Sequence, residues 1–289
     1  LPTLDLSKID IARNTPAEVY AQIITDLTSA KTKLATTKVK GRANKYAASA
    51  LLARVYLSKF QILGDQPSAN LAITESSYVI DSAGYTLATD YASLFNPKNN
   101  TNESIFEVVF DAQNFTRLAQ YYFSRNLSGR YEFAPETELI QSYEPADTLR
   151  LKASIAYDTV TKQPYGFKYK DVSGGTDHVY VLRLAEMYLI RAEALAYSNG
   201  SIASIQADIN IIRKRAGLEN TKADNIAALK LAIENERRHE FVFEGQRWPD
   251  LVRTKRAVAV LGINEKFTLF PIPLSEMQTN SLMTQNDGY

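Results

Sequence analysis

The densest group of chemically reactive side chains lies near the C-terminal end of the chain, in the stretch ERRHEFVFEGQRWPDLVR, residues 236–253. Its carboxylates and its histidine, His239, could serve as general acids and bases or as metal ligands. Its arginines could bind an anion, because a guanidinium matches the geometry of carboxylates and phosphates. The stretch therefore raises the question of whether it forms an active site or a structural network of charges.

Known catalytic motifs do not fit these residues. HEFVF, residues 239–243, begins like the zinc-protease motif HExxH, but Phe243 stands where the second histidine ligand is required. WPD, residues 248–250, is similar to a phosphatase loop, yet the chain has no cysteine to act as the nucleophile. The GxSxG, P-loop and GxGxxG motifs are also missing from the sequence. We therefore expect no catalysis, no cofactor and no metal site; a pair of glycosidase carboxylates has no local signature, which leaves that class open.

The segment that leads into this stretch changes from apolar to charged along one helical face. Ile226, Leu229 and Ile233 begin a stripe at helical spacing, and the stripe continues through acidic and basic residues until Gly245 ends the helix. Charges on a buried face persist only when they are paired and hydrogen-bonded. The pattern favours a structural role for these charges.

We therefore predict an ion network between helices, clamped by Phe241, Phe243 and Trp248. The alternative is an anion or substrate site, because structural ion networks and active sites look alike in a sequence. The residues assigned to the network are Glu236, Arg237, Glu240, Glu244, Arg247 and Asp250.

Composition limits the class of protein. The chain has 289 residues, 45% of them hydrophobic, and its 33 Lys plus Arg nearly balance 32 Asp plus Glu, for a formal charge of +1. Such a chain can build a core as one large or two ordinary domains. Without a concentrated basic surface, nucleic acid is not an expected partner. No apolar run reaches the ~18 residues of a membrane span.

The whole chain, 1–289, is predicted to form one mainly α-helical region. Helical repeats cover about 16–82 and 183–256, and a loop-rich, partly β insertion over about 85–181 joins them. An extended tail follows over about 257–289. Two β-prone segments lie in the insertion, SIFEVVF at 104–110 and PYGFKY at 164–169.

Helix starts and apolar faces support the two helical blocks. Thr15 is a plausible N-cap of the first helix, and Ser201 caps the last helix of a closely joined pair. The first helix of that pair has two apolar stripes, which predicts that it lies between neighbours on both sides. One stripe holds Leu184, Met187, Tyr188, Arg191 and Leu195, and the other holds Leu182, Ala185, Leu189, Ala192 and Ala196. Antiparallel pairs of this kind build tetratricopeptide-type arrays.

Several segments, in their order along the chain, resemble the SusD/RagB family, the nutrient-capturing surface lipoproteins of Bacteroidetes. The later ones are RLAEMYLIRAEAL (183–195), INIIRKRAGL (209–218), ERRHEFVFEGQRWPDLVR (236–253) and PIPLSEMQTNSLMTQNDGY (271–289). VYAQIITDLTSAK (19–31) and GRANKYAASALLARVYL (41–57) resemble an earlier helical pair of the family. Family members usually end in a tail like QNPGY, and here Asp287 replaces the proline.

This resemblance implies a SusD-like fold, with tetratricopeptide-like helix pairs as scaffold, a loop-rich ligand face, and neither a cofactor nor turnover. It also implies a SusC-like TonB-dependent outer-membrane transporter as partner and a place on the extracellular face of the outer membrane. Family members begin with a signal peptide, a lipidated cysteine and a long N-terminal section. This chain begins at Leu1 and resembles the later portion, so we expect the lipid anchor on an upstream cysteine that is not in this chain.

The loop at 111–133 is the predicted ligand face. Tyrosine rings offer flat apolar surfaces to a sugar, and Asn and Arg side chains can hydrogen-bond its hydroxyls. The alternative is that Tyr121, Tyr122 and Phe123 anchor the loop on the helices. Since three adjacent aromatic residues cannot all face one way, at least one of them is predicted to be buried. The residues assigned to the site are Asn114, Tyr121, Tyr122, Asn126, Arg130 and Tyr131.

Three functions stay open at this point. The favoured one is non-catalytic capture of an extracellular oligosaccharide and its delivery to the transporter. The RagB branch of the family implies capture of a peptide instead, through a groove that pairs with extended backbone. The third is a helical scaffold that binds only the transporter.

Overall fold

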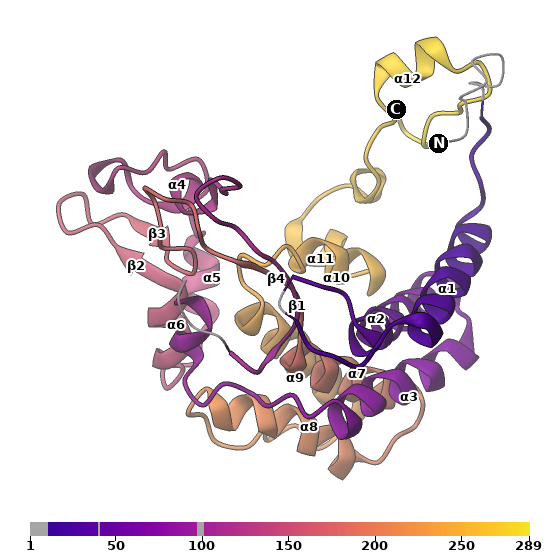
Figure 1. Cartoon of the computed structure of the whole chain (residues 1–289), viewed down its shortest axis with the longest axis horizontal. Helices are drawn as coiled ribbons and strands as arrows, with labels where there is room; N and C mark the ends of the chain where they lie inside the picture. The colour runs from indigo at the N-terminus through magenta and orange to yellow at the C-terminus, as the bar shows by residue number, and fades with distance from the viewer. Residues whose placement is uncertain (1–10, 40, 97–100) are drawn as a thin grey trace.

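Helices make up most of the chain in the computed structural model, which describes residues 11–39, 41–96 and 101–289. The first block holds α1 (Pro16–Lys33), α2 (Lys45–Leu63) and α3 (Gln66–Ser82). The second block holds α7 (Leu184–Tyr197), α8 (Ile202–Arg215), α9 (Ile226–Glu240) and α10 (Arg247–Arg253). Figure 1 shows the two blocks packed together, with a loop-rich part beside them. Within the described ranges, every helix is too short or too polar to span a lipid bilayer.

Local sequence explains where the first helices begin and end. Thr15 Oγ1 accepts from the backbone N–H of Glu18 at 3.3 Å, while the Glu18 carboxylate accepts from the backbone N–H of Thr15 at 2.8 Å, which is a capping box. The Asn44 side chain caps α2 by accepting from the Ala47 N–H at 2.9 Å. Gly64 ends α2 in the left-handed region, at φ +72°. The predicted cap at Thr15 is confirmed.

Helix α7 is buried on two faces, as its two apolar stripes predicted. Leu184, Met187 and Ile190 pack in one core with residues of α2 and α3. Ala192 and Ala196 pack in another core with residues of α8 and α9. The small alanine side chains allow these neighbours to approach closely. Helix α7 therefore joins the two helical blocks, and with α8 it forms the predicted antiparallel pair.

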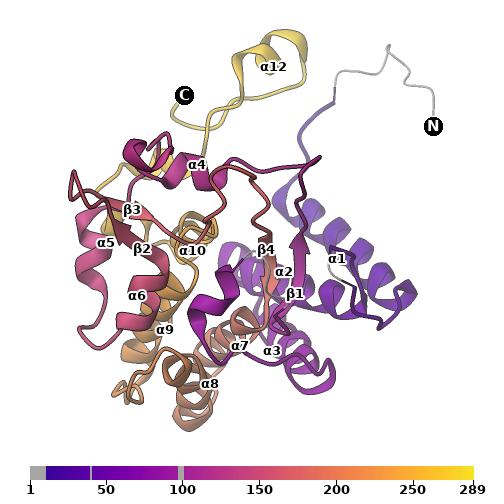
Figure 2. The same cartoon turned by 60° about the vertical axis from the view of Figure 1, so that its left-hand side comes forward.

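The loop-rich insertion contains short helices and two small antiparallel sheets. Its elements are η2 (Tyr91–Phe95), β1 (Ser104–Val108), α4 (Leu118–Tyr122), η3 (Arg125–Leu127), α5 (Thr137–Ser142), α6 (Thr148–Ser154), β2 (Ile155–Tyr157), β3 (Pro164–Gly166) and β4 (Val179–Arg183). Strand β1 pairs with β4, and β2 pairs with β3. Strands β1 and β3 lie within the two segments that the sequence predicted, whereas β2, β4 and the short helices were not predicted. Figure 2 shows β2 and β3 beside α5 and α6.

The β1–β4 sheet leads directly into the helical core. Arg183 is the last residue of β4 and also the N-cap residue of α7. The backbone N–H of Leu184 donates to Glu103 O at 3.0 Å, which holds the start of α7 against the segment before β1. Arg183 is therefore fixed at the junction of the sheet and the helices.

The C-terminal segment leaves the helical body and meets the residues before α1. Its short helices are α11 (Ala257–Leu261), η4 (Glu265–Thr268) and α12 (Leu274–Thr279). Asn280 Nδ2 donates to Ile11 O at 3.0 Å, and Arg13 Nη1 donates to Asn286 Oδ1 at 2.9 Å. Figure 1 shows α12 standing away from the body at the upper right. The sequence predicted this tail without its helices, which are too short to produce a helical period.

Ala53 tests how tightly the core around α2 is packed. It has no exposed surface and lies in the core that α2 shares with α3 and α7. Ala53→Leu should lower the free energy of unfolding by about 1–3 kcal/mol, because a close-packed core cannot take extra carbon atoms without strain. Ala207→Leu, on the exposed face of α8, is the control and should change it by less than about 0.5 kcal/mol. Urea unfolding followed by circular dichroism measures both, and equal midpoints would contradict tight packing at Ala53.

Candidate functional site

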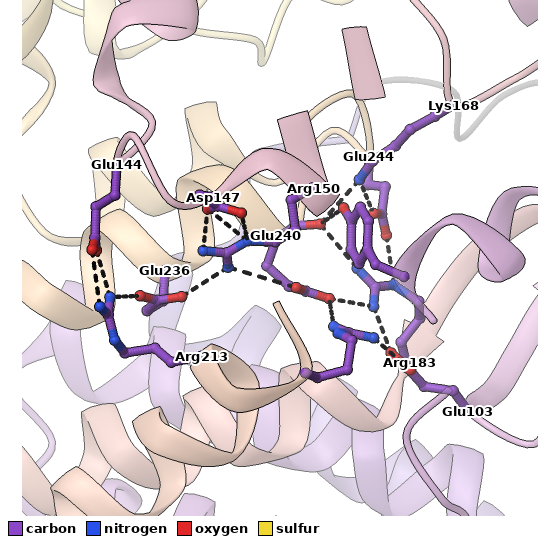
Figure 3. A network of polar contacts seen from close by, with 12 residues as sticks. Glu103, Glu144, Asp147, Arg150, Lys168, Arg183, Arg213, Glu236, Glu240 and Glu244 are labelled. Atoms are coloured by element: carbon purple, nitrogen blue, oxygen red, sulfur yellow. Dashed lines mark hydrogen bonds and ion pairs between the residues drawn. The ribbon is translucent and has the colours of Figure 1, made fainter. Parts of the chain in front are cut away.

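Arg183 is the centre of a buried ion network, which Figure 3 shows from close by. Its side chain is 2% exposed, and it donates to Glu103 Oε1 at 2.6 Å and to Glu240 Oε1 at 2.8 Å. It also donates to Glu244 Oε2 at 2.9 Å. Burial alone would raise the pKa of Glu240, but the positive charges of Arg215 and Arg183 lower that pKa below its ordinary value. Glu240 is therefore a carboxylate, and one guanidinium ties together the segment before β1, the end of α9 and the turn after α9.

The same network extends to α6 and α8. Arg150 of α6 is fully buried and donates to Asp147 Oδ2 at 2.9 Å and to Glu236 Oε2 at 2.8 Å. Glu236 also accepts from Arg213 Nη1 at 2.7 Å. Further pairs are Arg213 with Glu144, Arg215 with Glu103, Arg215 with Glu240 and Lys168 with Glu244. Charges from β4, α6, α8, α9 and the loops beside them therefore meet in one largely buried cluster (Figure 3).

The six residues that the sequence assigned to an ion network fall into two clusters. The first contains Glu236, Glu240 and Glu244, whose cationic partners lie outside the assigned set. The second contains Arg237 and Asp250, joined by a hydrogen bond of 2.7 Å from Arg237 Nε to Asp250 Oδ2. The sixth residue, Arg247, lies beside this second cluster and is more exposed than the other five.

Arg247 is that sixth residue, and it differs from the others because water reaches it. Its side chain is 31% exposed, and its Nη2 lies 3.3 Å from Glu234 Oε1. Exposed pairs of this kind contribute little to stability. Sequence reasoning missed the cations that pair with Glu236, Glu240 and Glu244. These cations are Arg150, Lys168, Arg183, Arg213 and Arg215. A signal existed for Arg183, because it is a charge within a strongly apolar run.

Side chains from outside α9 end this helix at Glu240. Three donors occupy its backbone carbonyl: Tyr91 Oη at 2.7 Å, Lys168 Nζ at 3.0 Å and Arg183 Nη2 at 3.1 Å. In a continuing helix this carbonyl would accept from the backbone N–H of Glu244. That N–H instead bonds to Phe241 O at 3.0 Å. The prediction that the helix runs on until Gly245 was therefore wrong.

Phe243, in the turn after α9, adopts a left-handed backbone conformation with φ +62°. For a bulky side chain this region costs on the order of 1–3 kcal/mol. The turn is held from both sides, because Phe243 O accepts from Tyr169 Oη at 3.4 Å and Glu244 Oε1 accepts from Lys168 Nζ at 2.6 Å. The Phe243 ring consequently points away from the ion network and packs on Tyr122, with ring centroids 4.8 Å apart.

The predicted aromatic clamp on the network was therefore partly wrong. Phe241 is buried with its ring centroid 4.8 Å from the Arg183 guanidinium, as a clamp requires. Trp248 packs on Phe270 of the C-terminal segment instead, at 5.8 Å between ring centroids. Phe243 contacts the loop-rich part. The sequence placed Phe241 and Phe243 on the helix that Gly245 ends and Trp248 on the next one, whereas the structure puts Phe241 and Phe243 in the turn between α9 and α10.

Four aromatic side chains form a patch at α4, which we call the aromatic face: Tyr121, Tyr122, Phe133 and Phe243. Phe133 is 54% exposed, and its ring meets that of Tyr121 edge-on at 6.0 Å and that of Tyr122 at 5.8 Å. Tyr122 is half-buried, and burial raises the pKa of its phenol. Gly166 of β3 lies against it, and a Cβ there would stand 2.8 Å from the Tyr122 ring. Phe133 and Phe243 were missed as site residues.

Arg130 borders the aromatic face. Its guanidinium carbon lies 5.3 Å from the Tyr121 ring centroid, and its Nη2 pairs with Glu132 Oε1 at 2.5 Å. Tyr131 is turned toward the β2–β3 sheet, where its hydroxyl donates to Pro164 O at 3.0 Å. The structure therefore brings Tyr121, Tyr122 and Arg130 together and uses Tyr131 to hold the loop.

The two assigned asparagines bond elsewhere. Asn126 Nδ2 donates to Asp158 Oδ1 at 3.4 Å, and the Asn114 backbone N–H donates to Asp111 Oδ1 at 2.7 Å within a turn. Phe123 is buried with its ring 4.8 Å from that of Tyr165. The prediction that at least one of the three adjacent aromatic residues is buried is confirmed.

His239 lies beside Ser142, a combination that could indicate a nucleophile and its base. Ser142 Oγ and His239 Nε2 are 2.9 Å apart, but the Ser142 hydroxyl donates to Leu139 O at 2.7 Å. Burial, together with the charge of Arg150, lowers the pKa of His239 to about 3, so the ring is a weak base. In the part of the chain that the structure describes, no group of three or more His, Asp or Glu side chains could hold a metal ion.

Comparison with known families decides the relationship. The model of the SusD family matches residues 106–268, which is more than half of the chain. The chain belongs to the SusD family. A second family model, described as starch-binding and associating with the outer membrane, matches residues 2–57. SusD-family members are non-catalytic binding proteins, which agrees with the prediction that this chain is not an enzyme.

Individual relatives agree with this assignment. A SusD-like protein of Bacteroides ovatus is 29% identical over 83% of this chain and 51% of its own length. A SusD superfamily structure from Parabacteroides distasonis is 27% identical with a TM-score of 0.86, and the match covers 99% of this chain and 72% of that chain. A structure described as a laminarin-binding SusD-like protein is 26% identical with a TM-score of 0.82, over 99% and 72% of the two chains. The predicted SusD-like fold is confirmed, and the chain spans about half the length of the curated relative.

Substitutions at Arg183 and Arg247 compare the contributions of a buried and an exposed arginine to stability. Arg183→Met should lower the free energy of unfolding by about 3–5 kcal/mol, because it leaves three buried carboxylates without a cation they share. Arg247→Met removes only an exposed pair and should cost no more than about 1 kcal/mol. Denaturant unfolding measures both variants. Similar small losses in the two would mean that the fold does not depend on the buried network.

Lys168 predicts a pH dependence of stability with a definite sign. Burial lowers its pKa from the ordinary 10.5 to about 8 in the folded protein, against the opposing charge of Glu244. Between these pKa values the unfolded chain keeps a proton that the folded protein has released, so the lysine favours folding more as the pH rises. The unfolding free energy of the wild type minus that of Lys168→Met should therefore increase from about pH 8 to about pH 10. A difference that shrinks over this range would contradict the assignment.

Proposed function

We propose that this protein captures an extracellular oligosaccharide without converting it and delivers it to a SusC-like TonB-dependent transporter of the outer membrane. The observation that carries the proposal is the aromatic face, a group of partly exposed rings from α4, Phe133 and the turn after α9, directed away from the helical core. This face has surface for a ligand and no group placed for catalysis. The chain spans about half the length of its curated relative, and we propose for it the binding role of that longer protein.

The aromatic face suits the mixed surface of a sugar. The rings of Phe133 and Tyr121 stand at 84° to each other, so they offer two differently directed apolar surfaces to sugar C–H groups. Arg130 and Glu132 lie at its border with 50% and 40% of their side chains exposed. Such an exposed pair is weak, so its donors and acceptors can turn to sugar hydroxyls at little cost.

The relatives support a sugar over a peptide as the ligand. One similar structure is described as laminarin-binding, and the family model that matches residues 2–57 is described as starch-binding. A peptide would be expected to pair its backbone with a strand edge or lie in a groove. The aromatic face instead consists of ring surfaces from α4, Phe133 and the turn after α9.

The family supports the proposed place in the cell. Association with the outer membrane is part of the description of the matching family model. We extend it to the extracellular face, with a lipid anchor on an upstream cysteine and a SusC-like transporter as partner. In this arrangement the aromatic face would hold the sugar while the helical blocks provide a rigid body.

The aromatic face predicts which side chains control sugar affinity. Tyr121→Ala and Phe133→Ala should each weaken oligosaccharide binding at least tenfold, ~1.4 kcal/mol, because each removes one stacking surface. Tyr122→Ala should weaken binding as well, but it also removes packing against Phe243, so its folding has to be checked by circular dichroism. Isothermal titration calorimetry with laminarin and starch oligosaccharides measures the affinities. Tyr157→Ala, an exposed tyrosine of β2, is the control and should leave them unchanged.

The outcomes distinguish the alternatives. If the protein binds a sugar and both Tyr121→Ala and Phe133→Ala keep full affinity, the aromatic face is not the site. Saturable binding of extended peptides without any sugar binding would favour the peptide-capturing alternative. Co-purification with a β-barrel transporter, with neither ligand bound, would favour the scaffold that binds only the transporter.

A further inference from the structure

Helices α7, α9 and α10 enclose a cavity that belongs neither to the aromatic face nor to the network around Arg183. Its volume is about 320 Å³. Apolar side chains line much of it, among them Leu231, Ile233 and Leu251, and the ring of Tyr197 lines it from α7. The cavity is therefore large enough for a small organic molecule, and its walls favour an apolar one.

The cavity is lined by more positively charged side chains than negatively charged ones. Its cations are Lys230, Arg237, Arg247, Arg253 and Arg256. Its carboxylates are Glu193, Glu234 and Asp250. The surplus of two positive charges at one place stands out in a chain whose formal charge is only +1.

The carboxylates of the cavity are already engaged by arginines. Asp250 accepts from Arg237 at 2.7 Å and from Arg253 at 2.7 Å. Glu193 accepts from Arg253 Nη1 at 2.6 Å. The two Glu234 oxygens lie 3.3 Å from Arg247 Nη2 and 3.0 Å from Arg256 Nε. These carboxylates therefore do not supply a partner for the remaining positive charge.

Lys230 is a cation of the cavity that is left with unused capacity. Lys230 Nζ lies 3.6 Å from the Tyr197 ring centroid, and among the described residues no carboxylate forms an ion pair with it. Burial lowers the pKa of Lys230, and the charge of Glu193 only partly opposes this effect. Arg237 is 6% exposed, and its Nη1 has no hydrogen-bond partner in the described part of the chain. That Nη1 atom is enclosed by protein atoms, so a ligand in the cavity would meet Lys230 and not this group.

We propose that this cavity binds a small organic carboxylate with an apolar body. The carboxylate meets the surplus positive charge at Lys230, and the apolar body occupies the space beside Leu231 and Leu251. Charge attracts the anion, and the apolar walls select against small, strongly hydrated anions. The site is built from other elements than the aromatic face, so this proposal stands or falls independently of sugar binding.

Benzoate is the probe for the test, with acetate as the carboxylate alone and benzyl alcohol as the neutral ring. Titrations followed by NMR should show saturable binding of benzoate at least tenfold tighter than that of either control compound. Lys230→Gln should weaken benzoate binding at least fivefold, whereas Lys214→Gln, an exposed lysine of α8, should not change it. Leu231 is 51% exposed, so Leu231→Glu should fold, and its negative charge should abolish binding. Leu231→Gln removes part of the apolar wall without adding charge, so it should bind benzoate more weakly than the wild type but more tightly than Leu231→Glu.

Two results would overturn the proposal. One is the absence of saturable benzoate binding in a folded sample. The other is equal benzoate affinity in the wild type, Lys230→Gln and Leu231→Glu, which would place any binding elsewhere. Oligosaccharide affinity measured on the same samples shows whether the aromatic face is affected, and no change is expected there.

Discussion

The structure depends on one buried cation, Arg183, and on the three carboxylates around it. Removing four charged groups from water is costly, and only direct hydrogen bonds between them offset that cost. Arg183 makes such bonds to Glu103, Glu240 and Glu244. Because these residues lie before β1, at the end of α9 and in the following turn, the charge pairing holds together parts of the chain that lie far apart in the sequence.

The turn after α9 carries this constraint to the surface. The bonds of Lys168 and Arg183 to the Glu240 carbonyl end the helix. Glu244 is then drawn inward by the same two cations, which sends Phe243 outward to Tyr122. The stretch that looked like an active site is therefore mostly scaffold, but one of its side chains belongs to the aromatic face. The buried ion network and the proposed binding surface therefore meet at two adjacent residues, Glu244 and Phe243.

Sequence patterns predicted the features that depend on neighbours along the chain. The N-cap at Thr15 and the two apolar stripes of α7 are local patterns, and the cap and the two buried faces are both present. The partners of the buried charges are not local: Arg150 lies 86 positions from Glu236, and Arg183 lies 80 positions from Glu103. A charged residue does not indicate in sequence which distant charge it will meet. The positive φ of Phe243 was missed for a related reason, since helical spacing gives no sign that distant side chains will end the helix.

Phe243 has a consequence for how this chain can change over evolution. Glycine or asparagine at this position would suit the backbone better than phenylalanine, because glycine has no Cβ and the short polar side chain of asparagine can hydrogen-bond locally in the left-handed region. Either replacement would also take away the ring that supports Tyr122. Selection for a more stable chain and selection for a complete aromatic surface therefore act in opposite directions at this residue. A phenylalanine retained here would indicate that selection for the aromatic surface outweighed selection for stability.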